Sequence, residues 1–374
     1  MKKILCAVLA VFLWMVGCPR AAYAAPSLSA RAAVLMEAST GQVLMESAAH
    51  ERLPMASTTK IMTALVALEH ADLSQPVQIS EKAVGVEGSS VYLKAGEILT
   101  MEQLLCALML ESANDAAAAI AIEIAGNIES FADLMNETAQ RIGLTDTHFT
   151  NPHGLDNAEH YSSAYDLAML ARYALQNPDF ARIVSTYKTN IPLGGDEGIR
   201  VLINHNKMLK YYDGTIGVKT GYTKRCGRCL VSAATRDGVT MIAVTLSAPD
   251  DWRDHTAMLD YGFSLYERAD LAQPGEIRYT LSCLGSATES VSASNKDGVS
   301  LVLPRDHGEI THVIEANRYL CAPVAAGDTV GEILFYCDGQ IIARLPLVAE
   351  ENAEAIPRPK GHLERIKEFI TPKK

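Results

Sequence analysis

The 374-residue sequence is poor in aromatic residues, which make up 6% of the chain, and poor in basic residues relative to acidic ones. Its 33 Lys and Arg residues against 44 Asp and Glu residues give a formal net charge of −11. This balance argues against nucleic acid as a main partner, because a phosphate backbone needs a Lys- and Arg-rich surface. The sequence has no internal repeat or low-complexity block, and its 48% hydrophobic content excludes a disordered chain. The length suffices for two domains.

Long apolar runs are absent after residue 16. At the N-terminus, two lysines at 2–3, an apolar run over 4–16 and the small-residue stretch 21–25, in which 22–24 fits the A-x-A cleavage pattern, form the three parts of a secretory signal peptide. We therefore expect residues 1–24 to be removed and the protein to be exported. A retained membrane anchor is one alternative, and a lipoprotein modified at Cys18 is a weaker one.

Cysteine is sparse once the predicted signal peptide is removed. Six remain: Cys106, Cys226, Cys229, Cys283, Cys321 and Cys337. The even number permits disulfides, but the spacing dictates none. The lone C-x-x-C of Cys226 and Cys229 has no second pair or nearby histidine to complete a zinc site, so we expect no metal. A disulfide between these two residues stays open. The basic stretch 224–229 around them either attracts an anionic substrate or forms a solvated turn.

Strand patterns lie at both ends of residues 25–272, and helical patterns fill the middle. The expected strands are a hairpin over 31–47 and single strands over 216–220, 229–235 and 239–246. The expected helices are 57–69, 101–110, 115–125, 131–142, one opened by the capping box 163–166, and 252–266. The economical solution is an α/β (α+β) fold in which one antiparallel sheet, built from both ends, is flanked by helices with a helical subdomain.

Short strands and turns follow over residues 275–349, which predict a small C-terminal all-β domain. Residues 350–374 read as a linker and a tail. Within 362–374, apolar residues recur at helical spacing among basic ones, a pattern typical of a helix on a membrane surface. A frayed polar tail is the alternative.

Ser57 and Lys60 are the first candidates for chemistry. If Ser57 opens a helix, the two side chains lie one turn apart on the same face. The apolar residues that follow would bury Lys60 and lower its pKa, so that a neutral amine can take the proton of the Ser57 hydroxyl. The S-x-x-K spacing alone is weak evidence, because Ser185 and Lys188 share it.

Two further motifs follow in the chain. Ser112 and Asn114 interrupt a helical stretch, where Ser112 can relay protons and Asn114 can bind an amide substrate; a plain helix–helix turn is the alternative. On a predicted strand, Lys219 and Thr220 can hold a carboxylate, and Gly221 lets a substrate backbone approach the edge. An ordinary strand end is the alternative there.

The three motifs in this order are those of class A β-lactamases and penicillin-binding proteins. The chain resembles a low-molecular-mass penicillin-binding protein of the D-alanyl-D-alanine carboxypeptidase family. The supporting stretches are 54–64, 151–156, 160–168 and 217–223. The resemblance covers about residues 28–270 and is architectural over the β domain. The family also carries a C-terminal amphipathic anchor, which the tail 362–374 resembles.

The resemblance implies a role for each motif residue. Ser57 would form the acyl-enzyme, Lys60 would be the general base, and Ser112 would relay protons. The substrate-binding residues would be Asn114, Lys219, Thr220, Gly221 and Tyr222. Backbone N–H groups of Ser57 and Tyr222 would form the oxyanion hole. The reaction would remove the last D-alanine from peptidoglycan stem pentapeptides without metal or cofactor, and β-lactams would acylate Ser57.

Two other functions stay open. A class A-like β-lactamase needs a carboxylate to activate the deacylating water, and Glu159 lies in the right region, although its surroundings match the carboxypeptidase pattern. A non-catalytic β-lactam-binding wall protein is the other, but intact Ser57 and Lys60 argue against it. We expect His153 and His160 to be structural, because Lys60 already supplies a base.

Overall fold

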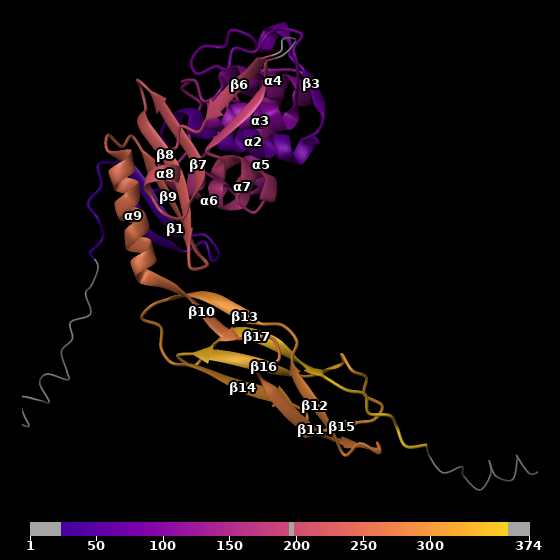
Figure 1. Ribbon diagram of the computed structural model, residues 1–374. Helices are drawn as coiled ribbons and strands as arrows, with labels where there is room; N and C mark the ends of the chain where they lie inside the picture. The colour runs from indigo at the N-terminus through magenta and orange to yellow at the C-terminus, as the bar shows by residue number, and fades with distance from the viewer. Residues whose placement is uncertain (1–23, 194–197, 358–374) are drawn as a thin grey trace, which may run out of the picture. The chain divides into compact units, whose positions relative to one another are not determined.

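The computed structural model describes residues 24–193 and 198–357, which form two compact units divided between Tyr266 and Glu267 (Figure 1). The predicted signal peptide, apart from Ala24, and the predicted tail 362–374 lie outside these residues. Across the two described ranges, no helix combines the length and the apolar character that crossing a membrane requires.

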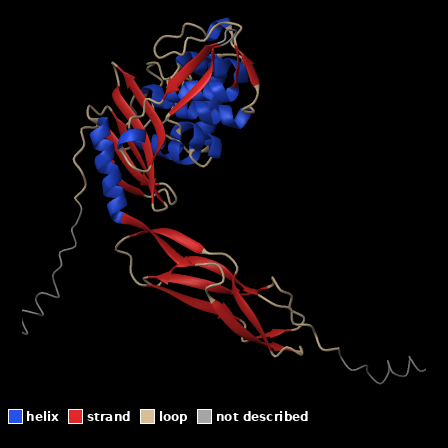
Figure 2. Ribbon diagram, in the orientation of Figure 1, coloured by secondary structure: helices blue, strands red, loops and turns tan. Residues whose placement is uncertain are grey.

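The first unit is built on a five-stranded antiparallel sheet with the order β2-β1-β9-β8-β7. Its strands are β1 (Ala32–Glu37), β2 (Val43–Ser47), β7 (Thr215–Thr223), β8 (Gly227–Arg236) and β9 (Val239–Leu246). β1 pairs with β9, with Ala32 opposite Leu246, so the start and end of the unit share one sheet. The prediction of one sheet built from both ends is confirmed. All six residues of β1 are buried, because helices contact both faces of the sheet (Figure 2).

Helices cover this sheet and form a separate cluster beside it. The helices are α2 (Lys60–His70), α3 (Met101–Leu110), α4 (Asn114–Ala125), α5 (Ile128–Arg141), α6 (Ala164–Ala174), α7 (Pro178–Ser185), α8 (Met208–Tyr211) and α9 (Asp251–Leu265). Both predicted capping residues cap their helices: the Thr100 hydroxyl accepts from the Gln103 amide, and the Ser163 hydroxyl accepts from the Asp166 amide. The predicted helix 57–69 differs at its start, where a 3-10 turn, η1 (Ala56–Thr59), precedes α2.

Several short elements of this unit had no counterpart in the sequence analysis. They are the hairpin of β3 (Pro76–Gln78) and β4 (Ile98–Thr100), the turn η2 (Glu81–Ala83), helices α7 and α8, and the hairpin of β5 (Lys188–Leu193) and β6 (Gly198–Ile203). In β6 the buried positions are Arg200 and Leu202, whereas the intervening apolar residues are exposed. Because the charged Arg200 occupies a buried position, the sequence lacks the alternation of apolar and polar residues that would have indicated a strand.

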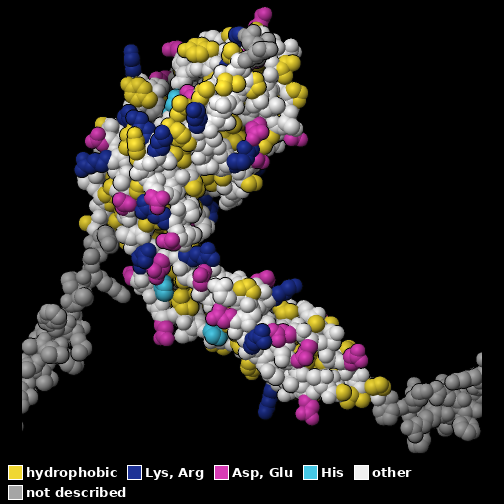
Figure 3. All heavy atoms as spheres, in the orientation of Figure 1, with side chains coloured by type: hydrophobic (Ala, Val, Ile, Leu, Met, Phe, Trp, Pro, Cys, Tyr) yellow, Lys and Arg dark blue, Asp and Glu magenta, His cyan; other side chains and the backbone are white. Residues whose placement is uncertain are grey.

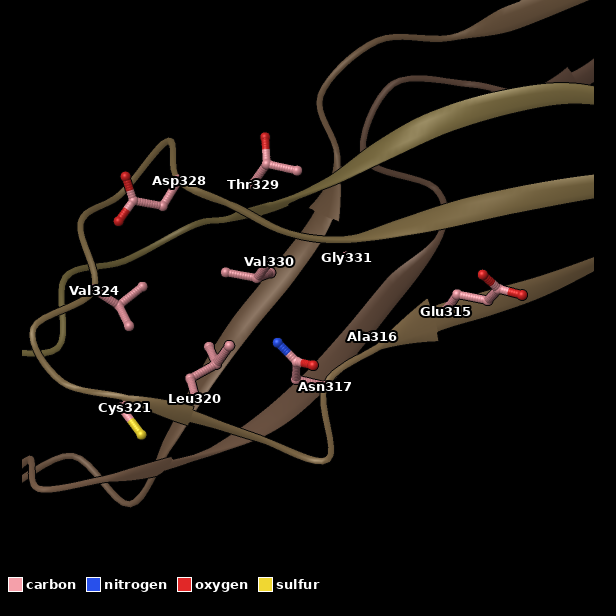
Figure 4. A pocket seen from close by; sticks show the side chains of 10 residues that line it. All are labelled: Glu315, Ala316, Asn317, Leu320, Cys321, Val324, Asp328, Thr329, Val330 and Gly331. Atoms are coloured by element: carbon pink, nitrogen blue, oxygen red, sulfur yellow. The ribbon is translucent and has the colours of Figure 1, made fainter.

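The second unit is all-β, in agreement with the predicted fold class. β10 (Tyr266–Ala272) pairs with β13 (Val299–Pro304), and a six-stranded sheet has the order β14-β16-β17-β12-β11-β15. These strands are β11 (Arg278–Leu284), β12 (Ser290–Asn295), β14 (Ile310–Ala316), β15 (Tyr319–Cys321), β16 (Thr329–Cys337) and β17 (Gln340–Ala349). A pocket of about 710 Å³ lies among β14, β15 and β16. Figure 4 shows Glu315 and Asp328 on opposite sides of it, which makes the pocket acidic.

A buried ion pair fixes the β5–β6 hairpin to the loop before β4. The Arg200 guanidinium pairs with Glu97 and also donates to the carbonyls of Val91 (2.9 Å) and Pro192 (2.8 Å). Both side chains are almost fully buried, at 8% and 1% exposure. Buried pairs of this kind contribute little net stability but are costly to break.

Replacing Arg200 by Ala should therefore lower the free energy of unfolding by roughly 3–5 kcal/mol, because it takes a charged partner from a buried carboxylate. Urea denaturation would measure the change. The matched control is Arg182→Ala, whose ion pairs with Glu102 and Asp179 are half-exposed. The control should lose at most about 1 kcal/mol. Equal losses for the two variants would contradict this assignment.

Candidate active site

Ser57 lies in the 3-10 turn η1, and Lys60 is the first residue of α2. Lys60 Nζ lies 3.0 Å from Ser57 Oγ, as the one-turn spacing predicted. The two threonines between them stabilise the turn from inside. The Thr58 hydroxyl donates to the Met55 carbonyl (2.7 Å), and the Thr59 hydroxyl donates to the Ala56 carbonyl (2.8 Å).

The amine of Lys60 has three oxygen neighbours and is not accessible to bulk solvent. Besides Ser57 Oγ, they are Asn114 Oδ1 at 2.6 Å and the His153 carbonyl at 2.7 Å, and Lys60 is 0% exposed. The two carbonyl oxygens can only accept hydrogen bonds. A neutral amine donates its two N–H groups to them and is left with its lone pair directed at the Ser57 hydroxyl. This is the arrangement that a general base requires.

Electrostatics favour that neutral form. Burial holds the pKa of Lys60 well below its usual value of 10.5, and the nearby Lys219 lowers it further whenever its own amine is protonated. The carboxylate of Asp115 acts in the opposite direction, but it is the smallest of the three causes. The apolar environment that the sequence predicted for Lys60 is therefore present.

Ser112 lies between α3 and α4, as predicted, whereas Asn114 is the first residue of α4 and its side chain is not free as expected. Asn114 is 4% exposed, and both of its amide atoms are engaged: Oδ1 with Lys60 and Nδ2 with the Glu87 carbonyl at 2.5 Å. Ser112 has a positive φ of 59° and lines the same pocket as Ser57. Among the hydrogen bonds of the described residues, none joins Ser112 to Ser57 or Lys60.

The third motif lies on β7 and forms one wall of a pocket of about 340 Å³ that also contains Ser57. Thr220, Gly221 and Tyr222 line it, whereas Lys219 is 1% exposed and donates to the Thr220 carbonyl at 2.9 Å. A Cβ on Gly221 would lie 3.2 Å from the Ser57 nitrogen, so glycine lets β7 approach the turn η1 closely.

Further residues line this pocket that the sequence analysis did not single out individually. They are Ser89, His205, Lys207, Arg228, Asp251 and Trp252. Arg228 lies in the basic stretch 224–229, so charge was the one available signal for it. The others come from loops and helix ends without a motif, and only the fold brings them together.

The two histidines near the site contact the backbone and other side chains. The Thr150 amide donates to His160 Nδ1 at 3.0 Å, so the opposite ring nitrogen carries the proton toward the Thr59 hydroxyl at 2.7 Å. Burial lowers the pKa of His160 to about 4 and that of His153 to about 3. Both rings are therefore neutral near pH 7, which agrees with a structural role.

Cys226 and Cys229 are free, buried thiols at the β7–β8 turn and on β8. The Cys229 thiol hydrogen-bonds to Cys226 and lowers the pKa of Cys226, whereas that contact and burial raise the pKa of Cys229. Within the described ranges, no group of three or more His, Cys, Asp or Glu side chains is arranged to hold a metal ion.

Comparison with known proteins places this geometry in a family. Residues 20–250 match the family model described as D-alanyl-D-alanine carboxypeptidase. The chain belongs to the D-alanyl-D-alanine carboxypeptidase family. Residues 266–355 match a second model, the C-terminal domain of penicillin-binding protein 5. Members of this family act on peptidoglycan peptides and bind β-lactams.

Relatives of similar length support the assignment. D-alanyl-D-alanine carboxypeptidase DacF of Bacillus subtilis is 33% identical, over 86% of this chain and 85% of its own length. DacC of Escherichia coli is 31% identical, over 92% of this chain and 88% of its own. The predicted family, enzyme class and fold class are confirmed.

Solved structures agree in fold. The carboxypeptidase DacD of Francisella tularensis has a TM-score of 0.64 and 29% identity, over 89% of this chain and 95% of its own. The Streptomyces K15 DD-transpeptidase has a TM-score of 0.62 and 35% identity, over 65% of this chain and 100% of its own.

Gly154 gives this family site a second close backbone approach. Its φ is +85°, and a Cβ there would lie 1.9 Å from the Ala56 carbonyl oxygen, next to the turn that carries Ser57. The preceding residue, His153, supplies a carbonyl to Lys60. Space at this position therefore controls the distance between the loop and the turn that carries Ser57.

Replacing Gly154 by Ala should destabilise the protein by roughly 1–3 kcal/mol more than Gly143→Ala, through overpacking. Gly143 is a matched control, since its φ is +84° and nothing lies within 4 Å of the added Cβ. Thermal unfolding of the two variants would measure the difference. Equal shifts would mean that the strained backbone, rather than the contact with Ala56, dominates.

Proposed function

We propose that this chain is a serine-type carboxypeptidase that removes the terminal D-alanine from peptidoglycan stem pentapeptides through an acyl-enzyme on Ser57. The observation that carries the proposal is the buried Lys60 amine, whose Nζ lies 3.0 Å from Ser57 Oγ. The membership of the carboxypeptidase family supports the substrate class.

In the proposed reaction, Ser57 Oγ attacks the carbonyl carbon of the last peptide bond while Lys60 Nζ takes the hydroxyl proton. The N–H groups of Ser57 and Tyr222 would stabilise the oxyanion that develops. Ser112 would relay the proton to the departing amine of D-alanine, and water would then hydrolyse the ester. We assign to Asn114 the task of orienting Lys60, while its contact with substrate stays a prediction.

The alternative of a class A-like β-lactamase is less well supported. Its deacylating water needs a carboxylate near the ester, but Glu159 is exposed and is not among the residues that line the pocket of Ser57. Many turnovers of nitrocefin per enzyme would favour a β-lactamase. A non-catalytic binder would release no D-alanine from diacetyl-Lys-D-Ala-D-Ala, although it would be folded.

We also propose that the chain acts outside the cytoplasm, since the family members act on the cell wall. The predicted signal peptide 1–24 would export it, and the predicted amphipathic tail 362–374 would hold it at the outer face of the cytoplasmic membrane. Fractionation of cells that produce the full chain, compared with a chain ending at residue 357, would test the second step.

Intact mass spectrometry with penicillin tests the nucleophile. The parent should gain the mass of one penicillin, and Ser57→Ala should gain none, because the ester needs the Ser57 hydroxyl. Ser185→Ala is the matched control: Ser185 shares the S-x-x-K spacing, but its hydroxyl donates to the Arg182 carbonyl at the end of α7. An adduct that persists in Ser57→Ala, or one lost in the control, would overturn the assignment.

The pH dependence of acylation tests the base. Because burial lowers the pKa of Lys60 well below 10.5, the amine loses its proton at a lower pH than an ordinary lysine does. The acylation rate constant should therefore fall toward acid pH but should not rise between pH 8.5 and 10.5. A tenfold rise per pH unit in that interval would indicate an ordinary lysine. Lys60→Arg should lower the rate at every pH by at least about 100-fold, since arginine stays protonated.

A further inference from the structure

The pocket of Ser57 must hold a negative charge at one end, because the proposed substrate ends in a free carboxylate. The sequence predicted Lys219 for this task, together with Thr220. Lys219 is 1% exposed, does not line the pocket, and already donates to the Thr220 carbonyl. Burial also lowers its pKa to about 7, so it is not a permanent cation near neutral pH.

Arg228 lines the pocket and carries a permanent charge. It lies on β8 directly opposite Tyr222 of β7, and Thr220 lies two residues before Tyr222 on the same strand face. Diagonal neighbours of this kind are within reach of a long side chain. The guanidinium and the Thr220 hydroxyl can therefore serve one ligand.

Two contacts fix the Arg228 guanidinium without using all of its donors. Nε donates to Asp251 Oδ1 at 2.9 Å, and the guanidinium carbon lies 5.7 Å from the centre of the Trp252 ring. Asp251 is 3% exposed at its side chain, whereas Arg228 is 44% exposed. Among the hydrogen bonds of the described residues, Arg228 uses only Nε. Its two terminal amino groups form the planar fork that matches a carboxylate.

Two other cationic side chains line the pocket but fit this role less well. His205 lies 3.2 Å from Glu111, and burial lowers its pKa, so it is a weak source of positive charge. Lys207 is exposed and presents a flexible point charge. Figure 3 shows Lys and Arg side chains on the face of the molecule near β7 and β8.

We propose that Arg228 is a further substrate-binding residue, which holds the terminal carboxylate of the D-Ala-D-Ala peptide together with Thr220. The inference rests on the proposed function, because a carboxypeptidase substrate has a free carboxylate next to the scissile bond. Asp251 and Trp252 hold the guanidinium in place. The basic stretch 224–229 thus contributes one specific ligand, while exposed Arg225 lies outside the pocket.

The experiment compares two substrates, diacetyl-Lys-D-Ala-D-Ala and the same peptide with a C-terminal carboxamide. The parent should prefer the acid. Arg228→Gln should lose about 10- to 100-fold in kcat/KM on the acid, the range expected for one charge-assisted pair. On the carboxamide it should change less than about threefold. Arg228→Lys should lose less on the acid, because it keeps the charge without the fork.

Two control variants sharpen the result. Arg225→Gln removes a charge from the same turn and should leave the acid-to-amide ratio unchanged, whereas Lys207→Gln tests the competing cation. The ratio also separates binding from folding, since a merely structural effect of Arg228→Gln lowers both rates equally.

An unchanged ratio in Arg228→Gln, or a collapse of the ratio in Lys207→Gln instead, overturns the assignment while leaving the proposed function intact. If the Gln variant does not fold, Arg228→Lys decides the case. An acid-to-amide ratio equal to that of the parent, with at most a threefold loss in kcat/KM on the acid, would show that the two terminal amino groups of Arg228 do not bind the carboxylate. A parent that cleaves neither peptide and takes up no penicillin overturns the proposed function, and this inference with it.

Discussion

A lysine amine sealed from water is the constraint on which the site depends. Lys60 has three oxygen neighbours, and two of them, on Asn114 and on the backbone at His153, can only accept hydrogen bonds. An ammonium group buried there would cost far more than a neutral amine. The surrounding chain therefore keeps the Lys60 amine neutral before any substrate binds. The amine can then accept the proton of the Ser57 hydroxyl.

The same constraint explains why such distant segments converge. The loop before β4 holds Asn114 in place. The side-chain Nδ2 donates to the Glu87 carbonyl, and the backbone N–H donates to the Ser89 carbonyl at 2.7 Å. The loop that carries His153 is tied to α2, because the Thr63 hydroxyl donates to the Pro152 carbonyl at 2.6 Å. Each neighbour of the amine is thus fixed by a second contact, which leaves little freedom for water to enter.

The sequence was informative where the chemistry is local. The one-turn spacing predicted the contact of Ser57 with Lys60, and the apolar residues after Lys60 predicted its burial. Strand patterns at both ends predicted one antiparallel sheet, because most residues of β1 and β9 are apolar. Capping boxes located the starts of two helices to the residue, since the hydrogen bonds involved span only three positions.

Long-range geometry was beyond the sequence. The second motif identified Asn114 as a polar candidate. It could not indicate that the side-chain oxygen and nitrogen of Asn114 are both directed into the interior. A lysine side chain on a strand can lie on either face of the sheet. Whether Lys219 is buried depends on which elements pack against its face of β7, and the sequence does not show this. Arg228, Asp251 and Trp252 meet only because the start of β8 and the start of α9 lie side by side. The strand β6 was hidden because Arg200 occupies an inward position.

The close approach of β7 to the turn η1 divides the pocket into positions that differ in their freedom to change. At Gly154 an added Cβ would lie 1.9 Å from the Ala56 carbonyl oxygen, and at Gly221 it would lie 3.2 Å from the Ser57 nitrogen, so both positions leave little room for a side chain. Tyr222 follows Gly221 directly, yet it is 66% exposed. Substitutions at Tyr222 and at the exposed Lys207 can therefore change the ligand preference of the pocket without disturbing the acylation chemistry, because both side chains lie at its solvent-exposed edge.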